Sequence, residues 1–530
     1  MRQLTHLLDK FLFPPRSQAA ANLLQFEQPE SCPMPQNHAG DRLAPLDALF
    51  LYIEKKEMPL HIGAVFVFDG HLAVDDLKSL IEAKLPLIPR YRQRLIFPPF
   101  NLGYPTWEFD PEFNLDRHIR HARIRPGTQA ALENLAGEIF SEIMDRNRPL
   151  WDITVVDGLR GGRTALIARV HHCLADGIAG VSLMNLIFDQ SREPAPLPRK
   201  RPLHAPPPPE PGANLLDAML DTYSHAVNRL FSLQSAALGV SQELVGELVQ
   251  GSLGRPVEAV TELGQPMQDF PFKAPSLGPR KVCWAELPMD EIDAVRHVYG
   301  AKVNDVCMAM LASAIGRYAH AHRLSVKNRV LRLMVPVNLR DPVQSQGLGN
   351  RISLVPVNIP LDISDPEELL RTVHRRMEAL KHAHAADLVV LGGSLLAMLP
   401  VPVQAQLTGL LSNVVPVLPF DMVCTNVPGP TAPLYLLGRK MLTYYGYVPI
   451  GDFMGVNCAM ASYNGSMYFG LTGDRACAPD LDRLRDFLND AFAQLKASAG
   501  IEAPRRPRRK RPPVHAGTVS GAPAELATAK

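Results

Sequence analysis

A proline-rich stretch divides this chain of 530 residues into two regions, and the division constrains the fold more than any other feature. Residues 193–211 contain nine prolines, a composition that forms a semi-rigid linker instead of a packed layer. The chain is also longer than one hydrophobic core normally serves. We therefore expect two domains, one on each side of the linker.

Strand-like and helical segments alternate on the N-terminal side. Three segments rich in β-branched residues predict strands, at 61–70, 148–159 and 162–172. Residues 74–85 predict a helix, and residues 131–147 predict another, with Leu132, Leu135, Ile139 and Ile143 on one face. Strands and helices that alternate in this way indicate an α/β layered domain.

The C-terminal side has the same alternation. Asn304 and Asp305 open an apolar helical segment, and Asn304 is a residue type that caps helices. An Asn464-Gly465 pair predicts a tight hairpin turn. The expected helices are 305–323, 366–383 and 480–497, and the expected strands are 331–340, 353–360, 422–427, 442–448, 455–463 and 466–473.

The expected organisation follows from these patterns. It has an N-terminal extension at 1–40, a first domain at 41–192, a linker with crossover helices at 193–280, a second domain at 281–498 and a basic, disordered tail at 499–530. The net charge of +2 argues against a dedicated nucleic-acid binder, which should carry a strong basic field. The seven cysteines form no C-x-x-C pair, so neither a zinc knuckle nor a disulfide framework is indicated.

No segment predicts a simple membrane span. The N-terminus is interrupted by Lys10 and lacks a secretory signal pattern. The uncharged segment 388–420 meets Pro400 and Pro402 before it reaches the ~20 apolar residues that a span needs. We expect a cytoplasmic protein with peripheral contact to a membrane or lipid-droplet surface, to which the arginine-rich residues 505–511 would contribute.

The segment HHCLADG, residues 171–177, carries the candidate chemistry, because it follows a predicted strand and precedes a predicted helix. Neighbouring strand residues point to opposite faces, so His171 and His172 have different surroundings and cannot easily share one metal ion. A histidine titrates near neutrality and can act as a general base. Asp176 orients the imidazole or anchors the loop, and Gly177 permits the turn into the helix. Two core histidines beside a helix start remain the alternative.

Other catalytic schemes find less support. No G-x-S-x-G elbow, P-loop or dinucleotide fingerprint occurs in the sequence. Cys173 lies beside the histidines, but a catalytic cysteine needs an activating environment, so we interpret it as a neighbour.

Together with its flanking blocks, HHCLADG resembles the H-H-x-x-x-D-G motif of bacterial wax ester synthase/acyl-CoA:diacylglycerol acyltransferases, within the chloramphenicol acetyltransferase-like superfamily. The resemblance covers about residues 41–497. The matching blocks are 45–68, Pro149-Leu150-Trp151 (PLW), Asn304-Asp305 (ND), 335–340, 347–353 (GLGNRIS) and 425–430 (TNVPGP).

This resemblance implies two chloramphenicol acetyltransferase-like domains related by a pseudo-two-fold axis, with a tunnel between them. His172 would deprotonate an alcohol, which attacks the acyl-CoA thioester directly. Acyl-CoA is then a co-substrate, and no cofactor or metal is expected. Asn304 becomes a candidate oxyanion donor beside its capping role, Asp305 its neighbour in the motif, and Asp176 a loop anchor through an arginine. The PLW residues would shape the domain or the pocket, with core packing the stronger interpretation for Trp151.

Three functions follow as hypotheses. The first is acylation of diacylglycerol, giving triacylglycerol, or of long-chain alcohols, giving wax esters. The second is a related transferase that acts on a smaller or carrier-bound acceptor. The third is a non-catalytic lipid-binding protein of the same fold, against which the intact His172 and Asp176 argue.

Overall fold

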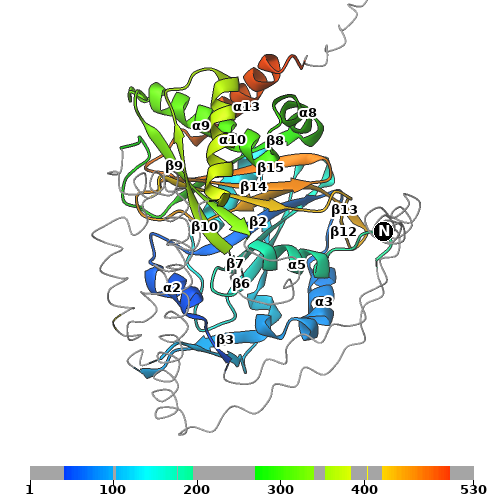
Figure 1. Ribbon diagram of the computed structural model, residues 1–530. Coiled ribbons are helices and arrows are strands. Elements are labelled where there is room, and N and C mark those ends of the chain that lie inside the picture. Colours follow the sequence, from blue (N-terminus) through cyan, green and yellow to red (C-terminus); the bar gives the residue numbers. More distant parts are fainter. Residues whose placement is uncertain are drawn as a thin grey trace, which may run out of the picture.

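A computed structural model describes residues 41–99, 103–175, 177–194, 269–338, 352–382, 403 and 420–501 (Figure 1). The N-terminal extension, most of the proline-rich linker with its crossover helices, almost all of the segment 388–420 and the basic tail beyond residue 501 lie outside the described residues. The expectations for them stay predictions. Within the described part of the chain, no helix is long and apolar enough to cross a bilayer.

The first of two larger sheets carries the histidine segment. Its strand order is β12-β13-β2-β7-β6-β5, and only β5 and β6 are parallel neighbours. Strand β7 is central and almost wholly buried, which suits its apolar sequence. The strands are β2 (His61–Phe68), β5 (Ile119–Arg123), β6 (Trp151–Asp157), β7 (Thr164–His171), β12 (Tyr435–Leu436) and β13 (Arg439–Tyr447), with helices α3 (Val74–Lys84), α4 (Gln129–Phe140) and α5 (Gly177–Ile187).

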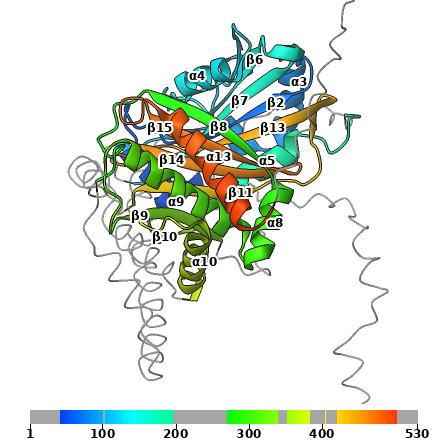
Figure 2. The same ribbon diagram turned by 90° about the horizontal axis from the view of Figure 1, so that it is seen from above.

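The second sheet belongs to the C-terminal half and has the order β10-β9-β11-β14-β15-β8. Figure 2 looks down on the helices that cover one of its faces. Helix α9 is buried along nearly its whole length, because it packs against α10 and α13 and shares one apolar core with them and the sheet. The elements are β8 (Arg280–Pro288), α8 (Met289–Tyr299), α9 (Val303–Ala321), β9 (Val330–Asn338), β10 (Ile352–Pro360), α10 (Pro366–His382), β11 (Met422–Pro428), β14 (Val456–Tyr463), β15 (Ser466–Asp474) and α13 (Leu481–Ser498).

A small antiparallel sheet and one helix flank the histidine segment. Helix α2 (Pro45–Ile53) and this sheet, ordered β1-β4-β3, form their own apolar cluster around Leu51, Trp107 and Leu150. The strands are β1 (Asp41–Arg42), β3 (Gln93–Ile96) and β4 (Thr106–Phe109), and single turns of 3-10 helix lie at η1 (Leu85–Leu87), η2 (Pro89–Arg92), η4 (Leu115–Arg117) and η5 (Arg160–Gly162).

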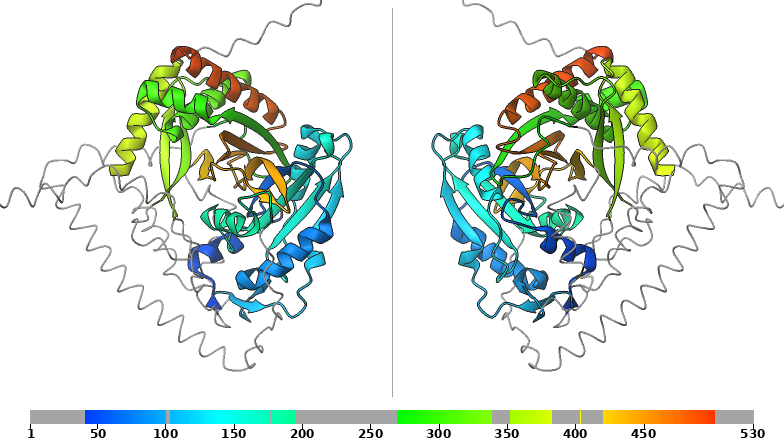
Figure 3. Two further views of the ribbon diagram at one scale, coloured as in Figure 1. Left: turned by 90° about the vertical axis from the view of Figure 1, so that its right-hand side faces the viewer. Right: turned by 90° about the vertical axis from the view of Figure 1, so that its left-hand side faces the viewer.

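The two halves interlock through a shared sheet and through a covered strand edge. Strands β12 and β13 come from the C-terminal half but extend the N-terminal sheet, through antiparallel pairing of β13 with β2. Helix α4 of the N-terminal half covers the outer edge of β8, where Glu133 and Ser141 accept the N–H groups of Trp284 and Arg280. An edge strand that is covered in this way offers no template for further pairing. Figure 3 shows the C-terminal helices on the side of the molecule away from the N-terminal half.

Most predicted elements that fall on described residues are confirmed within a few residues, including the hairpin at Asn464-Gly465, where both residues have positive φ. Two details are wrong. Ile143 does not lie on the face of α4, because the helix ends at Phe140 and leaves Ile143 exposed. Asn304 does not cap α9, since the helix begins at Val303 and Lys302 is the capping position.

Candidate active site

The histidine pair lies where β7 ends, between two neighbouring strands. The N–H of His171 donates to the carbonyl of Leu150, 2.9 Å away on the β6 side. The N–H of His172 donates to the carbonyl of Leu60, 3.0 Å away on the β2 side. The carbonyl of His171 then accepts the N–H of Leu174 in a turn that leads towards α5. The backbone of the pair is therefore held from both sides of a rigid sheet.

The two imidazoles have different surroundings, as strand alternation predicts. His171 is completely buried, and its Nδ1 accepts the N–H of Cys173 at 3.2 Å. Its Nε2 lies 3.2 Å from Oε1 of Glu54. Because Nδ1 is an acceptor, the ring proton of neutral His171 belongs on Nε2, facing the carboxylate. His171 is thus committed to internal contacts.

His172, unlike His171, is partly exposed. Its ring stacks on Phe50 of α2, with a centroid distance of 3.9 Å and an interplanar angle of 8°. A flat aromatic contact of this kind limits rotation of the imidazole. The arrangement can present a ring nitrogen to a substrate proton, as a general base requires.

Glu54, directly after α2, is the buried carboxylate behind the pair. Its Oε1 accepts the N–H of Leu60 at 2.9 Å, and its Oε2 accepts from Arg146 at 2.9 Å. Arg146 also donates to the carbonyl of Leu51. Burial raises the pKa of Glu54, but the contacts with His171, Leu60 and Arg146 outweigh burial and hold that pKa below its ordinary value. Glu54 is therefore an anion at neutral pH.

The PLW residues brace the same strand end. Pro149 and Leu150 are buried, and the carbonyl of Leu150 is the acceptor for His171 described above. Trp151 stacks on His118 at 4.5 Å and donates its indole N–H to the carbonyl of Tyr91 at 2.7 Å. These contacts place Trp151 in the core, in keeping with the packing interpretation.

The rest of the HHCLADG segment is only partly described. Asp176 lies outside the described residues, and Gly177 is the first residue of α5. Cys173 is buried, and burial raises the pKa of its thiol well above the ordinary value. A thiol that stays protonated is a poor nucleophile, which fits the interpretation of Cys173 as a neighbour.

The ND residues face other elements of the C-terminal half. The side-chain oxygen of Asn304 accepts from the amide of Asn426 on β11, within the TNVPGP block. Asp305 is buried, accepts the N–H of Lys302 at 2.9 Å and lies 2.7 Å from Nδ1 of His374 on α10. Asp305, not Asn304, therefore closes the first turn of α9, because its carboxylate reaches back to the capping position.

The sequence interpretation assigned no role to Phe50, Glu54 or Arg146. A signal for Glu54 was present, because it is the carboxylate that ends the apolar run LFLYI. Its burial, and the approach of Arg146 from a distant part of the chain, depend on tertiary structure. Among the described residues, no group of three or more His, Cys, Asp or Glu side chains has an arrangement that could hold a metal ion.

Comparison with known proteins agrees with the fold and the motifs. The wax ester synthase/diacylglycerol acyltransferase catalytic domain family matches residues 43–307, and its C-terminal domain family matches residues 348–496. The chain is 31% identical over 474 residues to a probable diacylglycerol O-acyltransferase of Mycobacterium tuberculosis, covering 86% of this chain and 96% of the relative. A putative diacylglycerol O-acyltransferase of Mycobacterium bovis matches equally well, with the same identity and coverage.

Solved structures share the same fold. The wax ester synthase/diacylglycerol acyltransferase of Marinobacter aquaeolei VT8 superposes with a TM-score of 0.63 at 25% identity, over 87% of this chain and 100% of that one. The first condensation domain of the CDA synthetase superposes with a TM-score of 0.53 at 14% identity, over 87% of this chain and 97% of that one, and shows the fold alone. The predicted α/β fold of two chloramphenicol acetyltransferase-like domains is confirmed. This chain belongs to the wax ester synthase/diacylglycerol acyltransferase family.

Proposed function

We propose that this enzyme is an acyl-CoA:alcohol O-acyltransferase that acylates diacylglycerol, a long-chain fatty alcohol, or both. Family membership and the names of the relatives support the reaction class. The observation that carries the residue assignment is the asymmetry of the histidine pair. His171 is fully committed to buried contacts, whereas His172 is partly exposed, stacked and held at a strand end.

His172 is the general base in this proposal. Its ring nitrogen takes the hydroxyl proton as the alcohol oxygen attacks the thioester carbonyl carbon. The new C–O bond gives a tetrahedral oxyanion, which collapses as the C–S bond breaks. The proton held by His172 then passes to the departing thiolate, so one ester and one free thiol form and no acyl-enzyme is needed. Acyl-CoA is a co-substrate, and the scheme requires no cofactor.

The other motif residues take supporting roles. Asp176 anchors the loop after the pair. Asn304 stays a candidate donor to the oxyanion, because the hydrogen bond from Asn426 to its side-chain oxygen fixes the direction of its own NH2 group. The PLW residues hold the backbone of the strand on which His171 lies. Each role is separable by mutation, because an oxyanion donor affects kcat while a fold residue affects stability.

Peripheral contact with a lipid surface belongs to the same proposal. Diacylglycerol and long-chain alcohols reside in membranes or droplets, so access to them requires such contact. The arginine-rich residues 505–511 supply positive charge for anionic headgroups. Liposome flotation of the full chain against a form ending at residue 503 tests the tail. Weaker flotation of the shorter form is expected, and equal flotation of the two would remove the tail from the proposal.

The activity test follows thiol release from palmitoyl-CoA with diolein, with hexadecanol and with no acceptor. We expect release only when an acceptor is present, together with triacylglycerol or wax ester identified by mass spectrometry. Release that is the same with and without acceptor would show thioester hydrolysis and contradict the proposal. Release with short alcohols alone would favour a transferase for a smaller acceptor.

A further inference from the structure

Residues 54–60 form a short turn between α2 and β2, which we call the 54–60 turn, and it contacts the backbone and side chain of the histidine pair. Glu54, at one end, faces Nε2 of His171. Leu60, at the other end, accepts the N–H of His172. The preceding helix supplies Phe50, which stacks on His172. Any shift of this segment therefore changes the position of both histidines.

The 54–60 turn is internally braced by two hydrogen bonds. The N–H of Met58 donates to the carbonyl of Lys55 at 2.8 Å, and the N–H of Leu60 donates to Oε1 of Glu54 at 2.9 Å. Met58, Pro59 and Leu60 are buried, while Glu57 is exposed. A braced and largely buried turn transmits a displacement from one end to the other instead of absorbing it.

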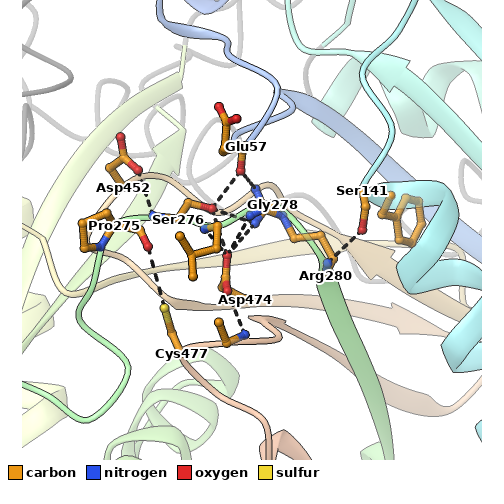
Figure 4. Close-up of polar contacts among 12 residues, drawn as sticks. Glu57, Ser141, Pro275, Ser276, Gly278, Arg280, Asp452, Asp474 and Cys477 are labelled. Atoms are coloured by element: carbon orange, nitrogen blue, oxygen red, sulfur yellow. Dashed lines mark hydrogen bonds and ion pairs between the residues drawn. The ribbon is translucent and has the colours of Figure 1, made fainter.

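On the side away from the histidines, the 54–60 turn forms hydrogen bonds and an ion pair with the C-terminal half (Figure 4). The carbonyl of Glu57 accepts from the guanidinium of Arg280 at 2.9 Å and lies 2.8 Å from Oγ of Ser276. Lys55 forms an ion pair with Asp452, whose carboxylate also accepts the N–H of Ser276 at 3.0 Å. A single turn thus contacts the histidines on one side and the other half of the molecule on the opposite side.

The residues that hold the turn are themselves fixed. We call Ser276, Arg280 and Asp474 the docking cluster. Arg280 and Asp474 are completely buried and 3.3 Å apart, and Oδ2 of Asp474 also accepts the N–H of Leu277 at 2.9 Å. Arg280 additionally donates to Oγ of Ser276 at 2.8 Å. A buried, multiply bonded guanidinium has little freedom to reorient, so it presents its donor to Glu57 rigidly.

A purely structural role for Glu54 is the alternative, because a buried carboxylate with an arginine is a common core contact. Glu54, however, divides its contacts between Arg146 and His171 and lies on a turn that the other half holds. We propose that Glu54 is a positioning residue for the histidine pair, and that the docking cluster holds its turn, so that the pair reaches its working geometry only when the C-terminal half is docked. This rests on the proposed function of His172.

The test uses the full chain with Glu54→Gln, and with Glu138→Gln on the exposed face of α4 as the matched loss of one negative charge. We expect Glu54→Gln to lower kcat for acceptor-dependent thiol release by about 10- to 100-fold, since small misplacements of a catalytic group have effects of that size. KM for palmitoyl-CoA should stay within about 2-fold, a factor too small to indicate lost binding. Glu138→Gln should behave as the wild type.

The pH profile separates positioning from stability. Loss of the Glu54 charge makes a protonated imidazole less favourable nearby, so the acidic limb of the kcat profile should move to lower pH. The other charged or titratable groups at this end of β7, Asp47, Arg146 and His61, are unchanged in this variant. A lower kcat with an unmoved limb would mean a structural role and would overturn the proposal.

Ser276→Ala tests the part played by the docking cluster, with Ser466→Ala, a partly exposed serine on β15, as its matched control. We expect Ser276→Ala to lower kcat, and the double variant with Glu54→Gln to lose less than the product of the two single effects, because both act on one turn. Independent, fully multiplicative effects would overturn the coupling. If the wild type itself releases no thiol with any acceptor, the proposed function fails. If the wild type is active and the variants release thiol at the same rate, the proposed function stands and this inference alone fails.

Discussion

Two charge clusters contact opposite sides of the 54–60 turn, and they differ in how far their side chains are exposed. The histidine cluster, Glu54, Arg146 and His171, belongs to the N-terminal half, and the side chain of Arg146 remains about one-third exposed. The docking cluster is wholly buried and joins the C-terminal half to the turn. Under the proposed function, the first cluster positions the histidine pair, and the second maintains the docking of the two halves.

The largest effect on stability is expected at the docking cluster. Arg280→Met leaves Asp474 buried without its guanidinium and should lower the free energy of unfolding by about 3–5 kcal/mol. The matched control is Arg296→Met, whose i,i+3 partner Asp293 has a side chain that is 38% exposed, so a loss of about 0–1 kcal/mol is expected there. Urea denaturation measures both. Equal losses in the two variants would contradict the role assigned to the docking cluster.

The contact between α4 and the edge of β8 should be the next most sensitive. A Cβ atom at Gly137 would lie 2.7 Å from the carbonyl oxygen of Arg280, which is backbone and cannot move aside cheaply. Gly137→Ala is therefore expected to lower the free energy of unfolding by about 1–3 kcal/mol, despite the higher helix propensity of alanine. Gly180→Ala on α5 is the control, because a Cβ atom there would have no atom of the described residues outside its own helix within 4 Å. A gain in stability at Gly137 would show that the two halves pack less closely.

A smaller loss of stability, with a larger loss of activity, is expected in the histidine cluster. Arg146→Met removes the cation beside Glu54 and should lower the free energy of unfolding by about 1–2 kcal/mol, because the side chain is partly solvated. Its kcat for thiol release should fall as well, since Glu54 loses a contact that orients it. An Arg146→Met enzyme that loses as much free energy of unfolding as Arg280→Met, but keeps the wild-type kcat, would contradict the roles assigned to the two clusters.

The smallest effect concerns the pH dependence of stability. Burial, together with the charges of Arg169, His171 and Arg280, lowers the pKa of His61 well below 6.5. In the unfolded chain, His61 therefore binds a proton near pH 6.5, whereas in the folded chain it stays neutral at that pH. The free energy of unfolding should fall as the pH drops below about 6.5, by at most ~1.4 kcal/mol per pH unit.

His61→Phe should remove that part of the fall between pH 7.5 and 5.5, as measured by urea denaturation at the two pH values. The buried His118, whose pKa is also lowered by burial, contributes in the same direction and is unaffected by the substitution. The pKa of Glu54 is also lowered, but a carboxylate acts near and below its ordinary pKa of about 4.5 and so does not interfere. An identical fall in both proteins would show that His61 is not the group that titrates.

Local patterns predicted much of the fold. The alternation of side chains along β7 correctly separated His171 from His172, because that alternation is a property of any strand. Long-range relations were not visible. The pairing of β13 with β2 joins segments that are far apart in the sequence, such as Tyr447 and Gly63, and no local pattern specifies a partner strand at that distance. The helix end before Ile143 and the cap of α9 were missed because tertiary contacts decide helix ends within a few residues.

The candidate site was predicted in part for the same reason. The motif predicted His172 as the base, a role that stays a prediction, whereas Glu54 and Phe50 became visible only when α2 was placed against the end of β7. From the sequence alone, a carboxylate at the end of an apolar run is expected to be exposed to solvent. The role of Asp176 stays a prediction, because that residue lies outside the described part of the chain.

The most direct test of the account is the rate of acceptor-dependent thiol release by His172→Ala, compared with the wild type and with His297→Ala on the exposed surface of α8. Loss of a general base should lower kcat by about 10²- to 10⁴-fold, while the change at His297 should leave kcat at the wild-type value. Thermal denaturation should show that His172→Ala remains folded. Undiminished thiol release by a folded His172→Ala enzyme would contradict the assignment of His172 as the base.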